Sequence, residues 1–355
     1  MSSNRHQPLI LTRRKRFLFS MITCAVVVIA IAVLAEALTR VRGFRPLARV
    51  QMFISMDRPE TYFVKHPSRG YAHGPGAFNV TVPQPYSFKA THLDTGLRIT
   101  HPLNGPIPRD QKAIWIFGCS FTHGWRLNDE ETYPWLIQQD LPAYEVVNFG
   151  VDGYSTVQSL IQFQESLKDR NKPAIVVVAY GVFHDQRSAL TRAWKKALLS
   201  NSCLGRMNFP YATLGTKKEL VLLNDSLEYP GLTLMRYAAL INYLDNQCNA
   251  SIEESYYSHD VSKAVLDKFW NLCKSNGIEF VLAGINRDPL TAEMLEFFSE
   301  KGAMTVDISV DSSLKENNSL PYDGHPTAIA NKQFAQKLEA FLLAKSIDKT
   351  KSTKK

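Results

Sequence analysis

The segment GCSFTHG, residues 118–124, places three side chains capable of nucleophilic or base chemistry between two glycines. It follows directly on the apolar run AIWIF, residues 113–117. The thiol of Cys119 is intrinsically the better nucleophile, whereas the hydroxyl of Ser120 needs a neighbouring base to take its proton. Ser120 could instead cap a helix, and His123 could line a cleft or contact a substrate. The pattern favours Ser120, because Cys119 holds the variable position of a glycine-x-serine turn, where its side chain should point into the domain.

A second polar segment, PYDGHP at residues 321–326, supplies the base that such a serine requires. An imidazole takes the serine proton, and a carboxylate holds that imidazole in the right tautomer and orientation. Asp323 and His325 are two residues apart, and Gly324 between them permits the local turn that lets their side chains meet. We therefore expect Ser120, His325 and Asp323 to form a catalytic triad, with purely structural roles for His325 and Ser120 as the alternative.

Apolar runs alternate with helix-like segments from Lys112 onward. Continuous apolar strands separated by helices are typical of a parallel sheet covered on both faces. We predict a three-layer α/β/α sandwich of flavodoxin-like type with about five parallel strands. The predicted strands are residues 113–118, 144–150, 174–181, 278–286 and 304–309.

The polar segments of the chain follow these predicted strands. Ligands of an open parallel sheet bind beyond the carboxyl ends of its strands. NFGVDGYS follows the second strand, YGVFHDQR the third and NRD the fourth, so all should meet GCSFTHG at one edge. The side chains that we expect to contact a substrate there are His123, Asn148, Asp185, Arg187 and Asn286.

In order and spacing, these segments resemble the SGNH (GDSL-type) hydrolase family, over about 230 residues from Ile114 to the last helix. GCSFTHG is similar to the family's first block, which puts the nucleophile at Ser120. DGHP is similar to the last block, which makes Asp323 and His325 the acid and base. The spacing Asp-x-His departs from the family, where two residues usually stand between.

The resemblance also implies an oxyanion hole. NFGVDG is similar to the family's second block, and its register with Asn148 assigns an oxyanion amide to Gly153. The third block usually carries an asparagine as a further donor, and YGVFHD has His184 in its place. The resemblance therefore implies that the amides of Ser120 and Gly153, with the His184 side chain, would stabilise the negative charge that develops on the substrate oxygen.

The N-terminal region contains a charge-free run from Phe17 to Ala35, close to the length that crosses a bilayer as a helix. We expect an uncleaved anchor, with cleavage near Ala35-Glu36-Ala37 as the alternative. The basic RRKR at 13–16 favours a cytoplasmic N-terminus and a periplasmic or other extracytoplasmic catalytic domain. The predicted organisation is a basic cytoplasmic tail (1–16), a transmembrane helix (17–38), a connector with a small β-rich extension (39–110), the hydrolase-like domain (111–346) with an insertion (197–255), and a disordered basic tail (347–355).

Composition narrows the classes of function. The chain has 355 residues, 45% hydrophobic and 21% charged, which is the balance of a folding sequence. Its net charge of +8 comes largely from basic clusters at the two ends, so we expect no nucleic-acid partner. No metal-binding cluster or phosphate-binding glycine loop is recognisable, so we expect no cofactor and no metal. Cys203 and Cys248 could form a disulfide, or the cysteines could be small buried side chains.

Three functions remain open from the sequence. The first is a membrane-anchored serine esterase that removes acyl groups from an envelope glycan or a lipid-linked carbohydrate. The second is an O-acyltransferase that uses the same triad, because water exclusion in the closed site decides the acceptor. The third is a catalytically degenerate glycan-binding or assembly protein, which the His184 and Asp-x-His departures keep open. The sequence indicates no particular protein partner.

Overall fold

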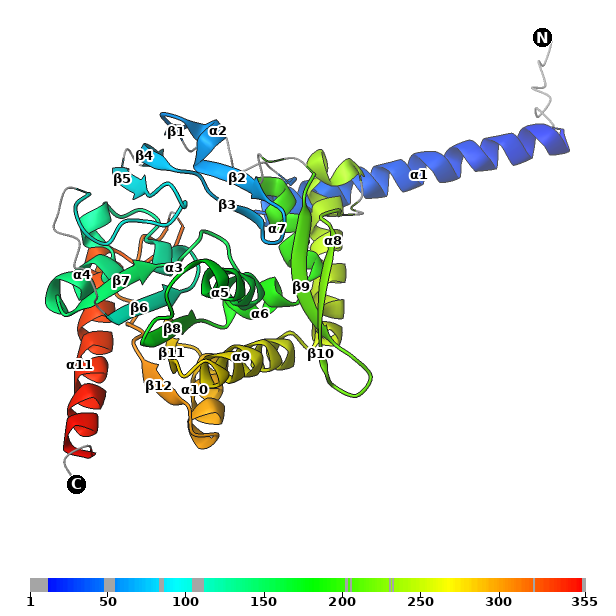
Figure 1. The fold of residues 1–355 in the computed structure, drawn as a ribbon. Coiled ribbons are helices and arrows are strands. Elements are labelled where there is room, and N and C mark those ends of the chain that lie inside the picture. Colours follow the sequence, from blue (N-terminus) through cyan, green and yellow to red (C-terminus); the bar gives the residue numbers. More distant parts are fainter. Residues whose placement is uncertain are drawn as a thin grey trace, which may run out of the picture. The chain divides into compact units, whose positions relative to one another are not determined.

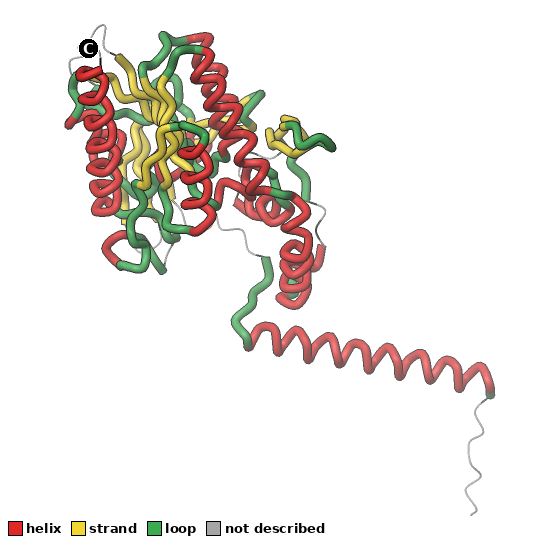
Figure 2. The backbone as a smooth tube through the Cα atoms, turned by 90° about the horizontal axis from the view of Figure 1, so that it is seen from below, coloured by secondary structure: helices red, strands yellow, loops and turns green. Residues whose placement is uncertain are grey.

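The computed structural model describes the chain in two compact units (Figures 1 and 2). One unit comprises residues 1–49 and 230–251, and the other comprises 50–229 and 252–355. The residues that the structure describes are 12–47, 55–82, 86–103, 112–201, 204, 206–229, 231, 233–321 and 323–352.

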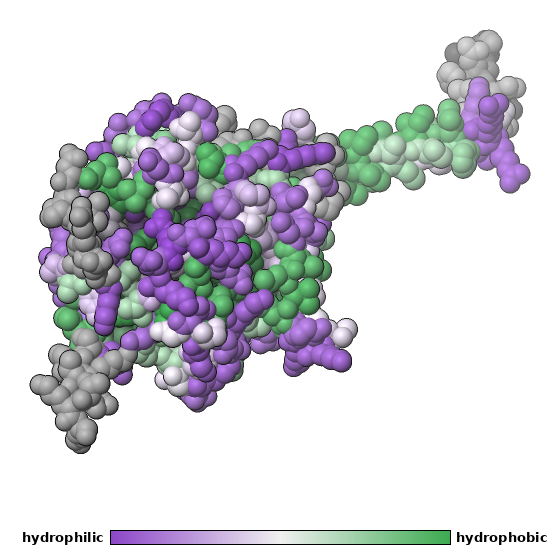
Figure 3. All heavy atoms as spheres, in the orientation of Figure 1, coloured by the Kyte–Doolittle hydropathy of each residue, from purple (hydrophilic) through white to green (hydrophobic). Residues whose placement is uncertain are grey.

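The first unit contains the apolar helix α1 (Arg13–Val41). Among the described residues, this is the one helix long and apolar enough to cross a membrane. Figure 3 shows its apolar surface (green) beginning after a basic, hydrophilic end (purple). Near its C-terminal end, the Glu36 carboxylate accepts hydrogen bonds from the backbone N–H groups of Ala239 (2.9 Å) and Leu240 (2.8 Å). Glu36 thereby satisfies two of the free amides at the start of α8 (Ala239–Ile252).

The second unit is built on a five-stranded parallel sheet in the order β12-β11-β8-β6-β7. Its strands are β6 (Lys112–Phe117), β7 (Tyr144–Asn148), β8 (Ile175–Tyr180), β11 (Glu279–Gly284) and β12 (Met304–Asp307). Figure 2 shows helices (red) on both faces of this sheet (yellow). The predicted three-layer α/β/α sandwich with five parallel strands is confirmed.

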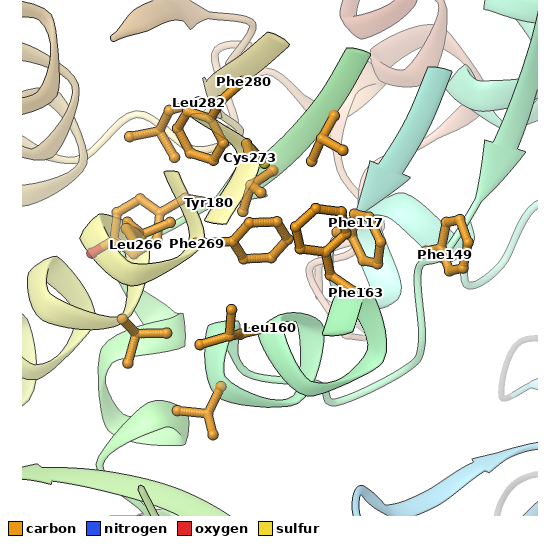
Figure 4. Close-up of a cluster of buried hydrophobic side chains, with 14 of the residues drawn as sticks. Phe117, Phe149, Leu160, Phe163, Tyr180, Leu266, Phe269, Cys273, Phe280 and Leu282 are labelled. Atoms are coloured by element: carbon orange, nitrogen blue, oxygen red, sulfur yellow. The ribbon is translucent and has the colours of Figure 1, made fainter. Parts of the chain in front are cut away.

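Alternation along each strand builds two hydrophobic cores. On one face, Phe117 of β6 packs with Phe163 and Phe269, whose rings stack at 4.7 Å (Figure 4). On the other face, Ile116 packs in a cluster with Ile137 and other buried side chains. The helices of the first face are α5 (Thr156–Asp169), α9 (Ser258–Ser275) and α10 (Pro289–Glu300), and those of the second are α4 (Tyr133–Asp140) and α11 (Ala328–Ser352).

A β-rich extension precedes the sheet in the chain. Its strands pair antiparallel as β1-β4-β5 and as β2-β3. They enclose a small core of Tyr62, Phe78, Val80 and Phe88. The elements are β1 (Ser55–Met56), α2 (Pro59–Tyr62), β2 (Phe63–His66), β3 (Gly70–His73), β4 (Gly76–Val82) and β5 (Tyr86–His92).

The predicted insertion contains elements of both units. The second unit holds α7 (Arg192–Asn201) and the antiparallel hairpin β9 (Asn208–Leu214) and β10 (Leu220–Ser226). The first unit holds residues 230–251. Cys248 is an exposed free thiol, and Cys203, its expected partner, lies outside the described residues. Helix α11 ends at Ser352 and so includes part of the segment 347–355 that we predicted to be disordered.

Candidate active site

Ser120 is the first residue of the short helix α3 (Ser120–His123), three residues after the end of β6. Cys119 stands at the N-cap position, and its side chain makes no capping hydrogen bond. The Ser120 Oγ lies 2.9 Å from His325 Nε2. Cys119 is fully buried in the core between the sheet and helices α4 and α11. The hydroxyl, and not the thiol, therefore faces the imidazole.

The turn that carries Ser120 is packed closely against the loop after β7. A Cβ atom added to Gly150 would lie 2.3 Å from the backbone nitrogen of His123. Asn148 ties the same two segments, because its Nδ2 donates to Thr122 O (3.0 Å) and its Oδ1 accepts from Gly150 N (2.9 Å). Asn148 is fully buried, so the structure gives this predicted substrate contact a role in positioning α3.

Asp323 and His325 meet through the turn at Gly324, whose φ of +69° lies in the left-handed region. The Asp323 Oδ1 is 3.4 Å from His325 Nδ1 and accepts a hydrogen bond from the His325 backbone N–H at 3.1 Å. The His325 side chain is 22% exposed and that of Asp323 is 27% exposed. Solvent therefore reaches this His–Asp pair.

Two residues that the sequence did not suggest hold the Asp323 carboxylate. Trp125 Nε1 donates to Asp323 Oδ2 at 3.1 Å, and Arg126 Nη1 lies 3.6 Å from the same oxygen. Burial alone would raise the pKa of Asp323, but the hydrogen bond and charge of His325, with the Arg126 charge, lower it below its usual value. Both residues lie in the turn after α3, about 200 residues before Asp323 in the sequence. Their contact with Asp323 therefore depends on the folded structure and could not be predicted from the sequence.

Aromatic rings surround the imidazole. The ring of His325 lies 5.6 Å from that of Phe121 and 6.4 Å from that of Trp125. The ring of Phe183 lies 5.2 Å from that of Phe121. Phe183 begins helix α6 (Phe183–Ser188) after β8, so it brings the third polar segment toward Phe121.

The sequence predicts the backbone amides of Ser120 and Gly153 as donors of the oxyanion hole. Ser120 begins α3, and the first amides of a helix have no acceptor within it. Gly153 has a φ of +77°, and an added Cβ would lie 2.5 Å from the Tyr71 hydroxyl. No described residue accepts a hydrogen bond from the Gly153 amide. Both N–H groups predicted for the oxyanion hole are thus free to bind an oxygen.

His184 is buried, with 2% of its surface exposed. Its Nδ1 accepts a hydrogen bond from the Gly181 backbone N–H at 3.3 Å, so the neutral ring carries its proton on Nε2. Within the described part of the chain, Nε2 has no hydrogen-bond partner. Burial, followed by the charge of Arg187, lowers the pKa of His184 well below its usual value. The ring is therefore a neutral N–H donor at ordinary pH.

The remaining predicted substrate contacts are engaged within the fold. Asp185 is 3% exposed, accepts from the Tyr180 hydroxyl at 2.6 Å and lies 2.7 Å from His259 Nδ1. Arg187 lies over the rings of Phe183 and Trp194, 4.8 Å from each ring centre.

Asn286 Oδ1 accepts from Val182 N (3.2 Å) and from the Thr291 hydroxyl (2.9 Å). These bonds tie the loop after β11 to the loop after β8. Asn286, like Asp185, forms hydrogen bonds to neighbouring elements of the fold, and among the described residues it forms none to Ser120 or His325.

A buried arginine joins the β-rich extension to the loop after α3. Arg98 is 1% exposed. Its guanidinium donates to the carbonyls of His123 (2.9 Å), Gly124 (2.6 Å) and Leu127 (2.6 Å), and to Asp129 Oδ1 (3.0 Å). The extension therefore holds the segment that begins at the candidate nucleophile.

His123 lies in a buried group that also includes His73, His92 and Asp152. One nitrogen from each histidine lies within 4.8 Å of the others. Burial lowers the pKa of His123 to about 3, and burial followed by the neighbouring histidines lowers that of His92. Burial would raise the pKa of Asp152, but His123 and His73 hold it well below its usual value. His73 and His92 end two strands of the extension, and their spacing in the sequence did not signal this group.

No protein-family model and no curated protein matches the chain. Among solved structures, it is similar to a lipolytic protein of the G-D-S-L family from Veillonella parvula, with 10% identity, a TM-score of 0.38, and coverage of 64% of this chain and 95% of that one. A psychrotrophic esterase from Pseudoalteromonas sp. matches with 12% identity, a TM-score of 0.41, and coverage of 66% and 98%. An acetyl-xylooligosaccharide esterase from Geobacillus matches with 13% identity, a TM-score of 0.36, and coverage of 65% and 93%.

The SGNH (GDSL-type) family, which the sequence motifs resemble, is therefore represented among the structures similar to this chain.

Proposed function

We propose that this chain is a membrane-anchored serine esterase of the SGNH type, with Ser120 as nucleophile, His325 as general base and Asp323 as the carboxylate that orients His325. The observation that carries the proposal is the 2.9 Å contact between Ser120 Oγ and His325 Nε2. A serine and an imidazole within hydrogen-bond reach, with a carboxylate next to the imidazole, is the arrangement that activates a hydroxyl. A degenerate scaffold would not need to keep it.

The proposed reaction proceeds through an acyl-enzyme. His325 Nε2 takes the Ser120 proton as Oγ attacks the ester carbon, and the negative charge on the carbonyl oxygen is met by the amides of Ser120 and Gly153. His325 then gives the proton to the departing alcohol, and the carbon–oxygen bond to that alcohol breaks. A water molecule, deprotonated by His325, releases the acid and restores Ser120. Asp323 stabilises the imidazolium that forms in each half-reaction.

His184 is the proposed third donor of the oxyanion hole. Its neutral ring and its buried Nε2, which has no hydrogen-bond partner among the described residues, support this role. A neutral imidazole N–H can donate a hydrogen bond as an amide N–H does.

The proposed substrate is an acyl ester of an envelope glycan or a glycolipid, reached from the extracytoplasmic side of the membrane. Helix α1, preceded by basic residues, supports an anchor with a cytoplasmic N-terminus. The rings of Phe121 and Trp125 near His325 support a carbohydrate, whose apolar face can stack on an aromatic surface.

The test uses the full-length protein in detergent with p-nitrophenyl acetate and with an acetylated oligosaccharide. We expect wild-type turnover of both and a loss of at least about 10³-fold in Ser120→Ala. Cys119→Ala is the matched control and should keep most of the activity, because its side chain lies in the core. Equal rates for wild type and Ser120→Ala would overturn the proposal. Acyl transfer to an added glycan, with little release of acetate, would assign the same triad to an acyltransferase.

A further inference from the structure

The buried histidine group lies on three elements that are far apart in the sequence. His73 ends β3, His92 ends β5, and His123 ends α3. All three side chains are 3% exposed or less. The mechanism proposed for Ser120 uses none of them, although His123 shares its helix with the nucleophile.

The hydrogen-bond partners of His92 determine which of its nitrogens carries the proton. His92 Nδ1 lies 2.9 Å from the Gly74 carbonyl oxygen, which can only accept. The proton of the neutral ring is therefore on Nδ1, and Nε2 presents a lone pair. That lone pair points to His123 Nε2, which is 3.0 Å away.

His123 cannot satisfy both of its neighbours with one proton. Its Nδ1 lies 3.0 Å from Asp152 Oδ1, and its Nε2 faces the lone pair of His92. A proton on Nδ1 suits the carboxylate but leaves two Nε2 lone pairs facing each other. A proton on Nε2 suits His92 but turns the Nδ1 lone pair toward a carboxylate oxygen. Either neutral tautomer of His123 therefore leaves one repulsive contact between lone pairs inside the buried group.

A cation between the rings removes this conflict. With the His123 proton on Nδ1, that nitrogen lies 3.0 Å from Asp152 Oδ1, and Asp152 Oδ2 lies 3.2 Å from His73 Nε2. A carboxylate that accepts from one ring nitrogen while the other binds a metal is the usual support of a metal-bound histidine. Gly74 O plays the same part for His92.

We propose that His73, His92 and His123 bind a zinc ion, with Asp152 as the carboxylate that orients two of the rings and balances part of the charge. Three imidazoles suit Zn²⁺, and ligand nitrogens about 2.0–2.1 Å from it lie roughly 3.3 Å apart in tetrahedral geometry. The nitrogen separations here, from 3.0 Å to at most 4.8 Å, bracket that value.

The ion joins the β-rich extension to the catalytic helix. Two ligands come from the extension and the third from α3, and Asp152 immediately precedes Gly153. Three histidines leave the fourth position of a tetrahedral zinc to a water molecule. The four side chains are buried or nearly so, which keeps that water away from bulk solvent and suits an ion that stabilises the fold. The zinc would thereby fix the positions of α3 and of the Gly153 loop.

The test measures zinc bound to the full-length protein in detergent, by mass spectrometry of the metal and by titration of the metal-free protein with ZnCl₂ against a chelating dye. We expect about one zinc per chain for the wild type, and binding weakened by at least about 10-fold in Asp152→Asn. His73→Gln and His92→Gln should each bind more weakly still. His101→Gln is the matched control, because His101 belongs to the same extension but contacts its neighbour Pro102 instead of the group.

Cobalt substitution provides a readout independent of activity and of the variants. Co²⁺ added to the metal-free wild type should give the intense visible absorption of a four-coordinate site, and excess Zn²⁺ should remove it. A wild type that binds no zinc and shows no cobalt absorption would overturn the proposal. The contact between His92 Nε2 and His123 Nε2 would then be explained by a proton shared between the two nitrogens. Equal zinc binding by wild type, His73→Gln and His92→Gln would also overturn it.

Discussion

Each end of the short helix α3 contacts a group of histidine and aspartate side chains, and the two groups differ in their access to solvent. Ser120 begins α3 and contacts His325, whose side chain is 22% exposed, beside Asp323 at 27%. His123 ends the same helix with a fully buried side chain, close to Asp152.

This difference in exposure is consistent with the two roles that we propose, proton transfer at His325 and cation binding at His123. An imidazole that takes and returns a proton must pass through the charged state, and the proposed base His325 is partly exposed and lies beside the Asp323 carboxylate. Burial holds the rings of His92 and His123 neutral, and neutral imidazoles are the form that binds a metal. Histidine and aspartate side chains therefore suit different chemistry at the two ends of α3, whose end residues Ser120 and His123 are three positions apart.

The largest expected effect comes from the exposed group. His325→Gln should lower kcat for p-nitrophenyl acetate by roughly 10³- to 10⁴-fold, because it removes the base that activates Ser120. The free energy of unfolding, measured by urea titration, should change by less than about 1 kcal/mol, since the ring is partly exposed. A His325→Gln variant with wild-type kcat would contradict the proposed role of His325 as the base and, with it, the contrast between the two groups.

The oxyanion amide should have the next largest effect. Gly153→Ala should lower kcat by about 10²-fold, because the amide moves when a Cβ meets the Tyr71 hydroxyl at a positive φ. Gly277→Ala is the matched control, since Gly277 also has a positive φ but has no atom within 4 Å of an added Cβ. An unchanged kcat in Gly153→Ala would remove Gly153 from the proposed site.

The buried group should show the opposite balance of effects. His92→Gln should lower the free energy of unfolding by about 1–3 kcal/mol, because it leaves buried partners unsatisfied. Its kcat should fall by less than about 10-fold, since the His92 ring nitrogens contact Gly74 O and His123 Nε2 and not Ser120 or His325. A loss of activity as large as that of His325→Gln, with stability intact, would contradict this assignment.

The smallest effect is a dependence of stability on pH through Asp323. Its pKa is lower in the folded chain than in the unfolded chain, so its ionised form stabilises the fold. This contribution is present above the unfolded value near 3.9 and is lost as the pH falls through the lower folded value. The stability difference between wild type and Asp323→Asn should therefore shrink as the pH falls below about 4. A difference that grows with acidification would contradict the lowered pKa.

The fold could be predicted from local sequence patterns because the strands of the sheet carry apolar runs that alternate with helical segments. The runs around Ile116 and Val177 predicted their strands, and the polar segments after them predicted the edge where Ser120 and His325 meet. These predictions needed only the periodicity of burial and the rule that ligands gather at the carboxyl ends of parallel strands.

The buried histidine group could not be predicted in this way. His73 and His92 lie in an antiparallel extension, and their approach to His123 depends on how that extension packs against α3. Likewise, the contact of Trp125 with Asp323 joins residues far apart in the chain and follows no local spacing. Long-range packing, and not any motif, brings such side chains together.

The central claim is that Ser120 is the activated nucleophile, and labelling with a fluorophosphonate tests it most directly. The reagent should modify the full-length wild type at a single residue, and peptide mass spectrometry should map that residue to Ser120. Prior exchange of His325 for Gln should abolish the reaction, while Cys119→Ala should leave it intact. Labelling elsewhere in the chain, or equal labelling of wild type and Ser120→Ala, would contradict the account.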